Sequence, residues 1–160
     1  MNIKSEYLSP VGVLTIVVSD GALVGLWLRG QKYHGPTAAI PAGDNDVMRR
    51  VTRWLDEYFA GGRPKIDFKL AATGTAFQQR VWHALGQIPY GKTVTYGDVA
   101  RRVGCGTPRA VGTAIGHNPI SIIVPCHRVV GANGNLTGYA GGLRAKEILL
   151  GIEQGIIPAK

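Results

Sequence analysis

The feature that most constrains this chain is the apolar run Ile122–Val130, which is interrupted by a proline, a cysteine and a histidine. A short run of Ile and Val predicts a strand that is buried on both faces. A proline inside such a run removes a ladder hydrogen bond, so the pairing is expected to break there. We therefore expect Cys126 to lie at a break in a buried segment, held rigidly and largely out of water. A thiol in that setting is either inert core filler or an activated nucleophile.

Composition limits the classes of protein that remain. The chain has 160 residues with 45% hydrophobic content, which is enough to form a core, and its formal net charge of +8 favours a polyanionic partner. Its 2 cysteines show no CxxC spacing, which argues against a disulfide scaffold or a cysteine zinc site. No apolar run approaches the ~20 residues of a membrane span. We expect reduced thiols, a cytoplasmic location and no association with membranes.

The first part of the chain predicts a small mixed domain. Residues 1–29 read as antiparallel sheet, residues 30–43 as a loop, and a helix is expected from Asp44 until Gly61-Gly62. Alternating apolar residues from Ile66 to Leu70 predict one more strand. No catalytic set is visible here, so we interpret residues 1–72 as a supporting domain and residues 73–160 as a second domain.

The second domain predicts several short helices with clear start signals. Thr75 with Gln78 forms a capping box, Thr95 can cap a second helix, and Thr107 followed by Pro108 can begin a third. The second and third helices flank a glycine turn, as in a helix-turn-helix. A last helix is expected from about Leu143 to Glu153.

The third of these helices, residues 108–116, has an unusual composition for a helix that reads bases. It carries Ala, Gly and Thr with a single arginine, Arg109, at its start. Small side chains permit either close packing against another helix or close approach of the backbone to the minor groove of DNA, with Arg109 entering the base stack. The nearby Lys92, Arg101 and Arg102 favour nucleic acid, because phosphate contacts dominate such binding.

A nucleophilic cysteine needs a base, and the base needs an orienting group. His127 follows Cys126 directly, but adjacent side chains of an extended chain point to opposite faces, so a bridging water or a bend at Pro125 would be required. Glu153 is the candidate orienting acid. The residues alone leave open a packed core thiol beside a structural histidine.

Several ordered blocks resemble the O6-alkylguanine-DNA alkyltransferases, also called methylated-DNA–protein-cysteine methyltransferases. The most specific block is Pro125–Val129, and the others are Phe77–Trp82, Ile88–Gly91, Arg109–Gly112, Gly116–Pro119, Gly138-Tyr139 and Gly141-Gly142. The resemblance implies an α+β fold. Its parts are a small ribonuclease H-like N-terminal α/β domain with an antiparallel sheet and a mostly helical, winged-helix-like C-terminal domain with a helix-turn-helix.

The resemblance also implies catalytic roles. Cys126 would attack the alkyl carbon on O6 of guanine, and also the alkyl carbon on O4 of thymine. It would keep the alkyl group as a thioether after a single turnover. His127 would take the thiol proton through a water, with Glu153 polarising the imidazole. Asn118 would tie the recognition helix to the active-site segment, and the Tyr96 hydroxyl would help rotate the nucleotide and donate to the departing guanine.

The remaining implied residues contact DNA or the extruded base. Arg109 would replace that base in the stack, and Thr107, Ala110, Gly112 and Thr113 would line the minor-groove face. Val129, Tyr139 and Ala140, with Tyr96, would form the substrate pocket, although Ala140 stands where many members of the family carry serine. The implied partner is double-stranded DNA, bound by a monomer that is able to act cooperatively along it. We expect no cofactor and no metal, since the first domain contains no cysteine and only His34.

Two other functions are consistent with parts of this pattern. One is a non-catalytic alkylguanine-binding protein that flags lesions for other repair pathways, although such relatives lack the cysteine. The other is a plain helix-turn-helix regulator, which the Ala- and Gly-rich helix disfavours.

Overall fold

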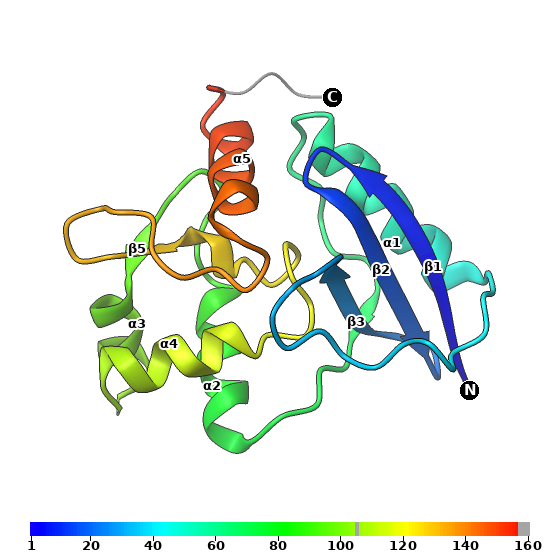
Figure 1. Ribbon diagram of the computed structural model, residues 1–160, viewed down its shortest axis with the longest axis horizontal. Coiled ribbons are helices and arrows are strands. Elements are labelled where there is room, and N and C mark those ends of the chain that lie inside the picture. The colour runs from blue at the N-terminus through cyan, green and yellow to red at the C-terminus, as the bar shows by residue number, and fades with distance from the viewer. Residues whose placement is uncertain (105, 157–160) are drawn as a thin grey trace.

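The computed structural model describes residues 1–104 and 106–156 and has two parts that pack side by side (Figure 1). An antiparallel sheet with one helix forms the N-terminal part, and short helices form most of the C-terminal part, so the α+β prediction is confirmed. Cys105 falls in the glycine turn that the sequence predicts, and it lies outside the described residues. No helix within the described ranges is both long enough and apolar enough to cross a membrane.

The N-terminal sheet is a meander whose strands are β1 (Asn2–Ser9), β2 (Gly12–Ser19) and β3 (Ala22–Leu28), each antiparallel to the next. Asp20 and Gly21 join β2 to β3 with φ of 50° and 79°, the left-handed backbone that a tight hairpin turn requires. The expected strand between residues 66 and 70 is reduced to β4 (Lys69–Leu70), which runs parallel to β3.

Helix α1 (Asp46–Phe59) covers one face of this sheet (Figure 1). The Asn45 side chain caps it by accepting a hydrogen bond from the Met48 N–H at 2.8 Å. The helix therefore begins at Asp46, two residues after the predicted start at Asp44. Its apolar residues recur at helical spacing and are buried, among them Val51, Leu55 and Tyr58. Burial of this stripe fixes the orientation of α1, and therefore the direction in which Tyr58 points.

The C-terminal part contains the three helices that capping residues predicted and the expected last helix, which has no side-chain cap. Their bounds are α2 (Ala76–Leu85), α3 (Tyr96–Val103), α4 (Pro108–Gly116) and α5 (Leu143–Glu153). Thr75, Thr95 and Thr107 each accept a hydrogen bond from a backbone N–H of the first turn. Gly104 ends α3 with φ of 76°, which turns the chain sharply before α4 begins.

The prediction of a strand through Ile122–Val130 is wrong for most of its length. The run is buried as expected, but it forms a turn, the 3-10 helix η1 (Cys126–Arg128) and the two-residue strand β6 (Val129–Val130). Strand β6 pairs in parallel with β5 (Val94–Thr95). The physical reason is Asn118, whose side chain accepts from the Ile120 N–H at 3.0 Å and donates to the Val124 carbonyl at 2.9 Å, in place of a ladder.

The two parts of the chain meet along β3. Leu26 donates its N–H to the Pro119 carbonyl at 2.8 Å and accepts from the Ser121 N–H at 2.9 Å. This bridge attaches the segment before Cys126 to the N-terminal sheet, and one continuous cluster of buried side chains spans both parts. The division at residues 72 and 73 stays a prediction, whereas the support that β3 gives to the cysteine segment is direct.

Candidate active site

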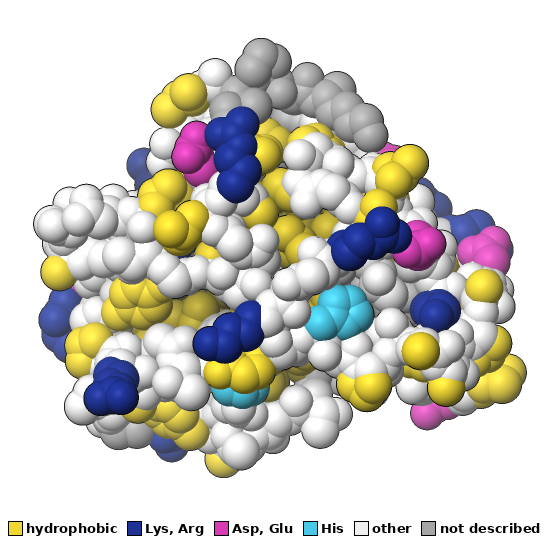
Figure 2. All heavy atoms as spheres, viewed as in Figure 1, with side chains coloured by type: hydrophobic (Ala, Val, Ile, Leu, Met, Phe, Trp, Pro, Cys, Tyr) yellow, Lys and Arg dark blue, Asp and Glu magenta, His cyan; other side chains and the backbone are white. Residues whose placement is uncertain are grey.

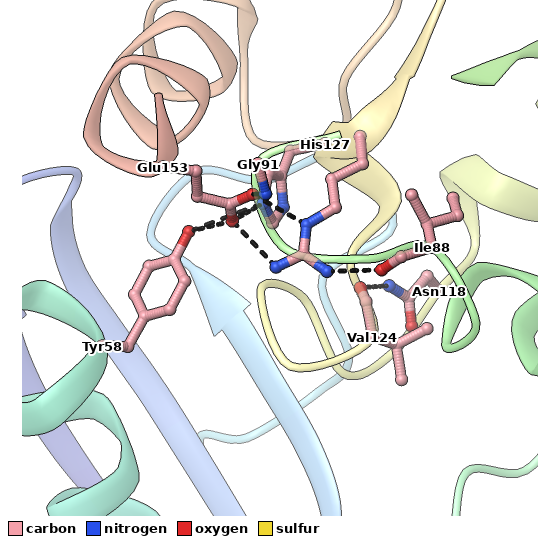
Figure 3. A network of polar contacts seen from close by, with 8 residues as sticks. Tyr58, Ile88, Gly91, Asn118, Val124, His127 and Glu153 are labelled. Atoms are coloured by element: carbon pink, nitrogen blue, oxygen red, sulfur yellow. Dashed lines mark hydrogen bonds and ion pairs between the residues drawn. The ribbon is translucent and has the colours of Figure 1, made fainter. Parts of the chain in front are cut away.

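Cys126 begins η1 and is 4% exposed. The side-chain amide of Asn118 donates to its Sγ at 3.3 Å. The same amide donates to the Val124 carbonyl at 2.9 Å (Figure 3). Burial raises the pKa of the Cys126 thiol, and the Asn118 hydrogen bond and the charge of Lys146 oppose that rise. Asn118 therefore fixes the position of the sulfur and supplies a donor that stabilises the thiolate.

The imidazole of His127 lies against the Glu153 carboxylate, with Nε2 2.6 Å from Oε2 and both side chains fully buried. An ionised carboxylate only accepts hydrogen bonds, so His127 carries its proton on Nε2. Nδ1 is then the unprotonated nitrogen, and it is buried with no hydrogen-bond partner among the described residues. Glu153 thus fixes the tautomer in which the free lone pair of His127 can act as a base.

Because Cys126 and His127 lie in η1, the angle between their side-chain directions is smaller than it would be in a strand. Successive residues of a 3-10 helix are about 120° apart, whereas they are about 180° apart in a strand. No direct hydrogen bond joins the thiol to the imidazole in the described part of the chain. The sequence argument required a bridging water or a bend at Pro125, and the path of the proton between the two side chains stays a prediction.

Five hydrogen bonds converge on the Glu153 carboxylate (Figure 3). Besides His127, Arg128 donates through Nε to Oε1 at 2.8 Å and through Nη2 to Oε2 at 3.0 Å. The Gly91 N–H donates to Oε1 at 3.2 Å, and the Tyr58 hydroxyl donates to Oε2 at 2.5 Å. Burial alone would raise the pKa of Glu153, but the hydrogen bonds from His127, Arg128 and Tyr58 hold it well below its usual value.

His127 itself stays neutral at rest. Burial lowers the pKa of His127 below its usual value, and the attraction of Glu153 only partly offsets this effect. The buried network therefore contains one compensated ion pair, Arg128 with Glu153, beside an uncharged base. Arg128 is also anchored to the Ile88 carbonyl at 2.8 Å through Nη1.

Lys146 is a second buried cation near the thiol. Its side chain is fully buried, and Nζ donates to the Val129 carbonyl at 2.5 Å and to the Thr137 carbonyl at 2.8 Å. Burial lowers the pKa of Lys146 to about 8, and the nearby Cys126 opposes that shift. The lysine holds the loop after β6 against α5 and contributes positive charge on the side where a thiolate would form.

A pocket of about 580 Å³ opens in front of Cys126. Of the residues predicted from the sequence, those that line it are Tyr96, Arg109, Gly112, Thr113, Cys126, Tyr139 and Ala140. Over α4, at the edge of this site, the charged side chains visible in Figure 2 are basic. The structure thus brings the thiol, the small-residue face of α4 and the glycine-rich loop before α5 together around one opening.

Other predicted residues take different positions. Thr107 uses its hydroxyl to cap α4, and Ala110 donates the capped N–H at 3.1 Å, so neither lines the pocket. Val129 is fully buried and does not line the pocket, and its carbonyl accepts from Lys146. The Tyr96 hydroxyl donates to the Thr137 and Gly138 carbonyls at 2.9 and 3.1 Å, and burial raises its pKa.

The N-terminal part contributes residues that the sequence argument missed. Lys32 and Tyr33 line the pocket from the loop after β3. The Tyr33 ring stacks on the His117 ring with centroids 3.8 Å apart, and the Lys32 N–H donates to the Ala140 carbonyl at 2.9 Å. No local signal marks these residues, because they lie in a loop without periodicity and reach the site only through the tertiary fold.

These features define a class of protein. A buried cysteine has a histidine and a carboxylate behind it and an open pocket in front of it, and the pocket wall belongs to a helix-turn-helix. This is a cysteine-dependent transfer site built on a nucleic-acid-binding scaffold.

Comparisons with known proteins assign the family. Residues 2–72 match the ribonuclease-like domain and residues 76–155 the DNA binding domain of 6-O-methylguanine DNA methyltransferase. The chain belongs to this family. It is 47% identical to the methylated-DNA–protein-cysteine methyltransferase of Mycobacterium bovis over 152 residues, covering 94% of this chain and 92% of the relative. The corresponding Methanosarcina acetivorans protein is 46% identical over 148 residues, covering 91% and 94%.

Solved structures agree with this assignment. The crystal structure of Mycobacterium tuberculosis O6-methylguanine methyltransferase superposes with a TM-score of 0.87 at 44% identity, covering 100% of this chain and 97% of that one. A crystal structure of the Mycobacterium tuberculosis protein in complex with DNA superposes with a TM-score of 0.86 at 43% identity, covering 99% and 95%. The two-part architecture is therefore the architecture of the family.

Proposed function

We propose that this protein repairs DNA by direct reversal and that Cys126 accepts the alkyl group of O6-alkylguanine in a stoichiometric, irreversible reaction. The observation that carries the proposal is the position of Cys126 at the wall of the pocket, in front of a His127–Glu153 pair whose tautomer leaves Nδ1 free. Membership of the methyltransferase family supplies the substrate class.

The chemistry is a displacement at the alkyl carbon. The thiol proton of Cys126 passes through a water to Nδ1 of His127, and the thiolate attacks the carbon attached to O6. The S–C bond forms as the C–O6 bond breaks, and the bonding pair remains on guanine, which takes up a proton. The product is a thioether, for which the site supplies no cleaving nucleophile, so each molecule reacts once.

Access to the lesion requires the target nucleotide to leave the duplex, at a cost of a few kcal/mol. We propose that α4 approaches the minor groove and that Arg109 enters the stack in place of the extruded base. Support comes from the small side chains on the pocket face of this helix, such as Gly112 and Thr113. Thr107 and Ala110 contribute at the helix N-terminus, where the backbone N–H groups favour phosphate.

The extruded base would occupy the pocket between Tyr96 and the loop that carries Tyr139 and Ala140. The Tyr96 hydroxyl would give up its hydrogen bond to the Thr137 carbonyl and donate to the departing base instead. Val129, whose carbonyl accepts a hydrogen bond from Lys146, would support the rear of the pocket. Asn118 would keep the sulfur aligned with α4. A pocket of about 580 Å³ is compatible with O4-alkylthymine as well as O6-alkylguanine.

The network is supplied by one chain, which supports action as a monomer. Its net charge of +8 supports binding to a polyanion. A nucleophilic thiol must stay reduced, and this requirement supports a cytoplasmic location.

Mass spectrometry tests the proposal. After incubation with duplex DNA containing O6-methylguanine, one added methylene on the peptide containing Cys126 is expected, with restored guanine in the DNA. Cys126→Ser should bind the same duplex without gaining mass. If the wild-type protein binds tightly with unchanged mass, it is a lesion-flagging protein and the proposed transfer is wrong.

A further inference from the structure

The catalytic carboxylate is held from the first half of the chain by Tyr58, which no motif singled out. Tyr58 lies near the end of α1 and is 1% exposed, and its hydroxyl donates to Glu153 Oε2 at 2.5 Å. The hydroxyl is also 3.5 Å from Nε2 of His127. Figure 3 shows the phenol reaching from α1 towards the carboxylate that His127 also contacts.

The ring of Tyr58 is fixed by its aromatic neighbours. Trp54 stacks on it with centroids 5.2 Å apart and planes 8° apart, while Phe59 meets it edge-on at 5.1 Å and 87°. Burial, followed by the charge of Glu153, raises the pKa of Tyr58 well above its usual value. The hydroxyl is therefore a permanent proton donor that points in one direction.

The oxygen that Tyr58 binds is the oxygen that polarises the base. Oε2 of Glu153 accepts from Tyr58, from His127 and from Nη2 of Arg128. Donors that share one oxygen weaken one another, because each draws on the same negative charge. The hydroxyl of Tyr58 thus limits the attraction that Glu153 exerts on a proton at His127.

We propose that Tyr58 is a positioning residue that sets the proton affinity of His127 through the Glu153 carboxylate, keeping the imidazole neutral until it takes the thiol proton. This inference rests on the proposed function, since it takes His127 to be the base for Cys126. It gives the supporting N-terminal part a direct share in the chemistry.

The other groups that face His127 make this arrangement sensitive to one donor. Arg128 on η1 and Lys146 on α5 both disfavour a charged imidazole, as burial does, whereas Glu153 on α5 favours it. Cys126 is its neighbour on η1, and from α1 Tyr58 brings a neutral hydroxyl. Because the favouring group is a single carboxylate, a change in its acceptor strength passes directly to His127.

The test replaces Tyr58 in the full-length chain and measures the rate of alkyl transfer from free O6-benzylguanine as a function of pH. The acidic limb of this pH–rate profile is the part that is compared. A neutral base works above its pKa, so raising the pKa of His127 moves this limb to higher pH. Tyr58→Phe should move it up by roughly half a unit, and an NMR titration of the His127 imidazole should show the same shift without any substrate. Tyr90→Phe is the matched control, since that ring meets the ring of Tyr58 at 6.2 Å but its hydroxyl is not among the donors to Glu153.

A second substitution has the opposite sign. Incorporation of 3-fluorotyrosine at position 58 keeps the shape and makes the hydroxyl a stronger donor, so the limb and the imidazole titration should move to lower pH. A slower rate with an unmoved limb in either variant would show that Tyr58 is only a packing residue and would overturn the inference. Absence of transfer by the wild-type protein would overturn the proposed function instead, while the NMR titration would still decide the role of Tyr58.

Discussion

Replacing Glu153 by glutamine removes a charge on which two buried groups depend. The carboxylate accepts from Arg128, His127, Tyr58 and Gly91, and its side chain is fully buried. An amide of the same shape offers one acceptor oxygen and turns an NH2 group towards donors. Arg128 would be left as a buried cation without its partner, which costs about 3–5 kcal/mol.

This cost converts into a measurable melting temperature. For a chain of this size about 1 kcal/mol corresponds to roughly 2–4 °C, so Glu153→Gln should lower the melting temperature by roughly 6–20 °C at neutral pH. Circular dichroism measures the transition directly. A decrease of less than about 2 °C would contradict the view that this ion pair is buried and essential to the fold.

The same substitution should affect transfer through the tautomer of His127. A glutamine NH2 facing Nε2 would make that nitrogen an acceptor and would put the proton on Nδ1, so the base towards Cys126 is lost. The transfer rate should fall by roughly 10²–10⁴-fold, the usual contribution of a general base. It should be measured below the lowered melting temperature, where the variant is folded.

The pH dependence of stability has a definite sign. The pKa of Glu153 is lower in the folded state than in the unfolded chain, where it is about 4.3. Its contribution is therefore complete above that value and declines as the pH falls towards the folded-state pKa. The difference in melting temperature between wild type and Glu153→Gln should narrow below roughly pH 4, and a gap that widens there would contradict the assignment.

Three further outcomes are expected. Arg109→Ala should slow transfer from duplex DNA far more than transfer from free O6-benzylguanine, and an equal loss with both substrates would remove the finger role. Affinity for DNA should fall with salt by a log–log slope of about 0.9 per phosphate contact, whereas a flat response in a titration would remove the electrostatic argument. Asn118→Ala should destabilise the fold by about 1–3 kcal/mol in urea, because the buried Ile120 N–H loses its acceptor and the Val124 carbonyl loses one of its donors. The substitution should also slow transfer, and unchanged stability and rate would contradict the positioning role of Asn118.

Local signals predicted most of the helices correctly. Thr75, Thr95 and Thr107 each begin a helix where the sequence placed one, because N-cap chemistry depends on residues only a few positions apart. The run around Cys126 was harder to predict, since a side chain, Asn118, replaces the ladder hydrogen bonds there. The periodicity of apolar residues cannot show that a side chain takes the place of ladder hydrogen bonds.

The candidate site was predictable only to the extent that its motif was. Cys126, His127 and Glu153 come together as the resemblance implied, although their roles stay proposals. Tyr58 and Tyr33 could not have been found in the same way. Each reaches the site through tertiary packing over a long sequence separation, and each looks locally like an ordinary helix or loop residue.

The most direct measurement counts alkyl groups against protein molecules. Wild-type protein is incubated with an excess of duplex DNA carrying O6-methylguanine, and the intact mass and the remaining free thiol are followed with time. We expect the Cys126 thiol to disappear in step with the gain of a single methylene per molecule, after which the reaction stops although lesions remain. Continued turnover, or lesion repair with the Cys126 thiol still free, would contradict the account.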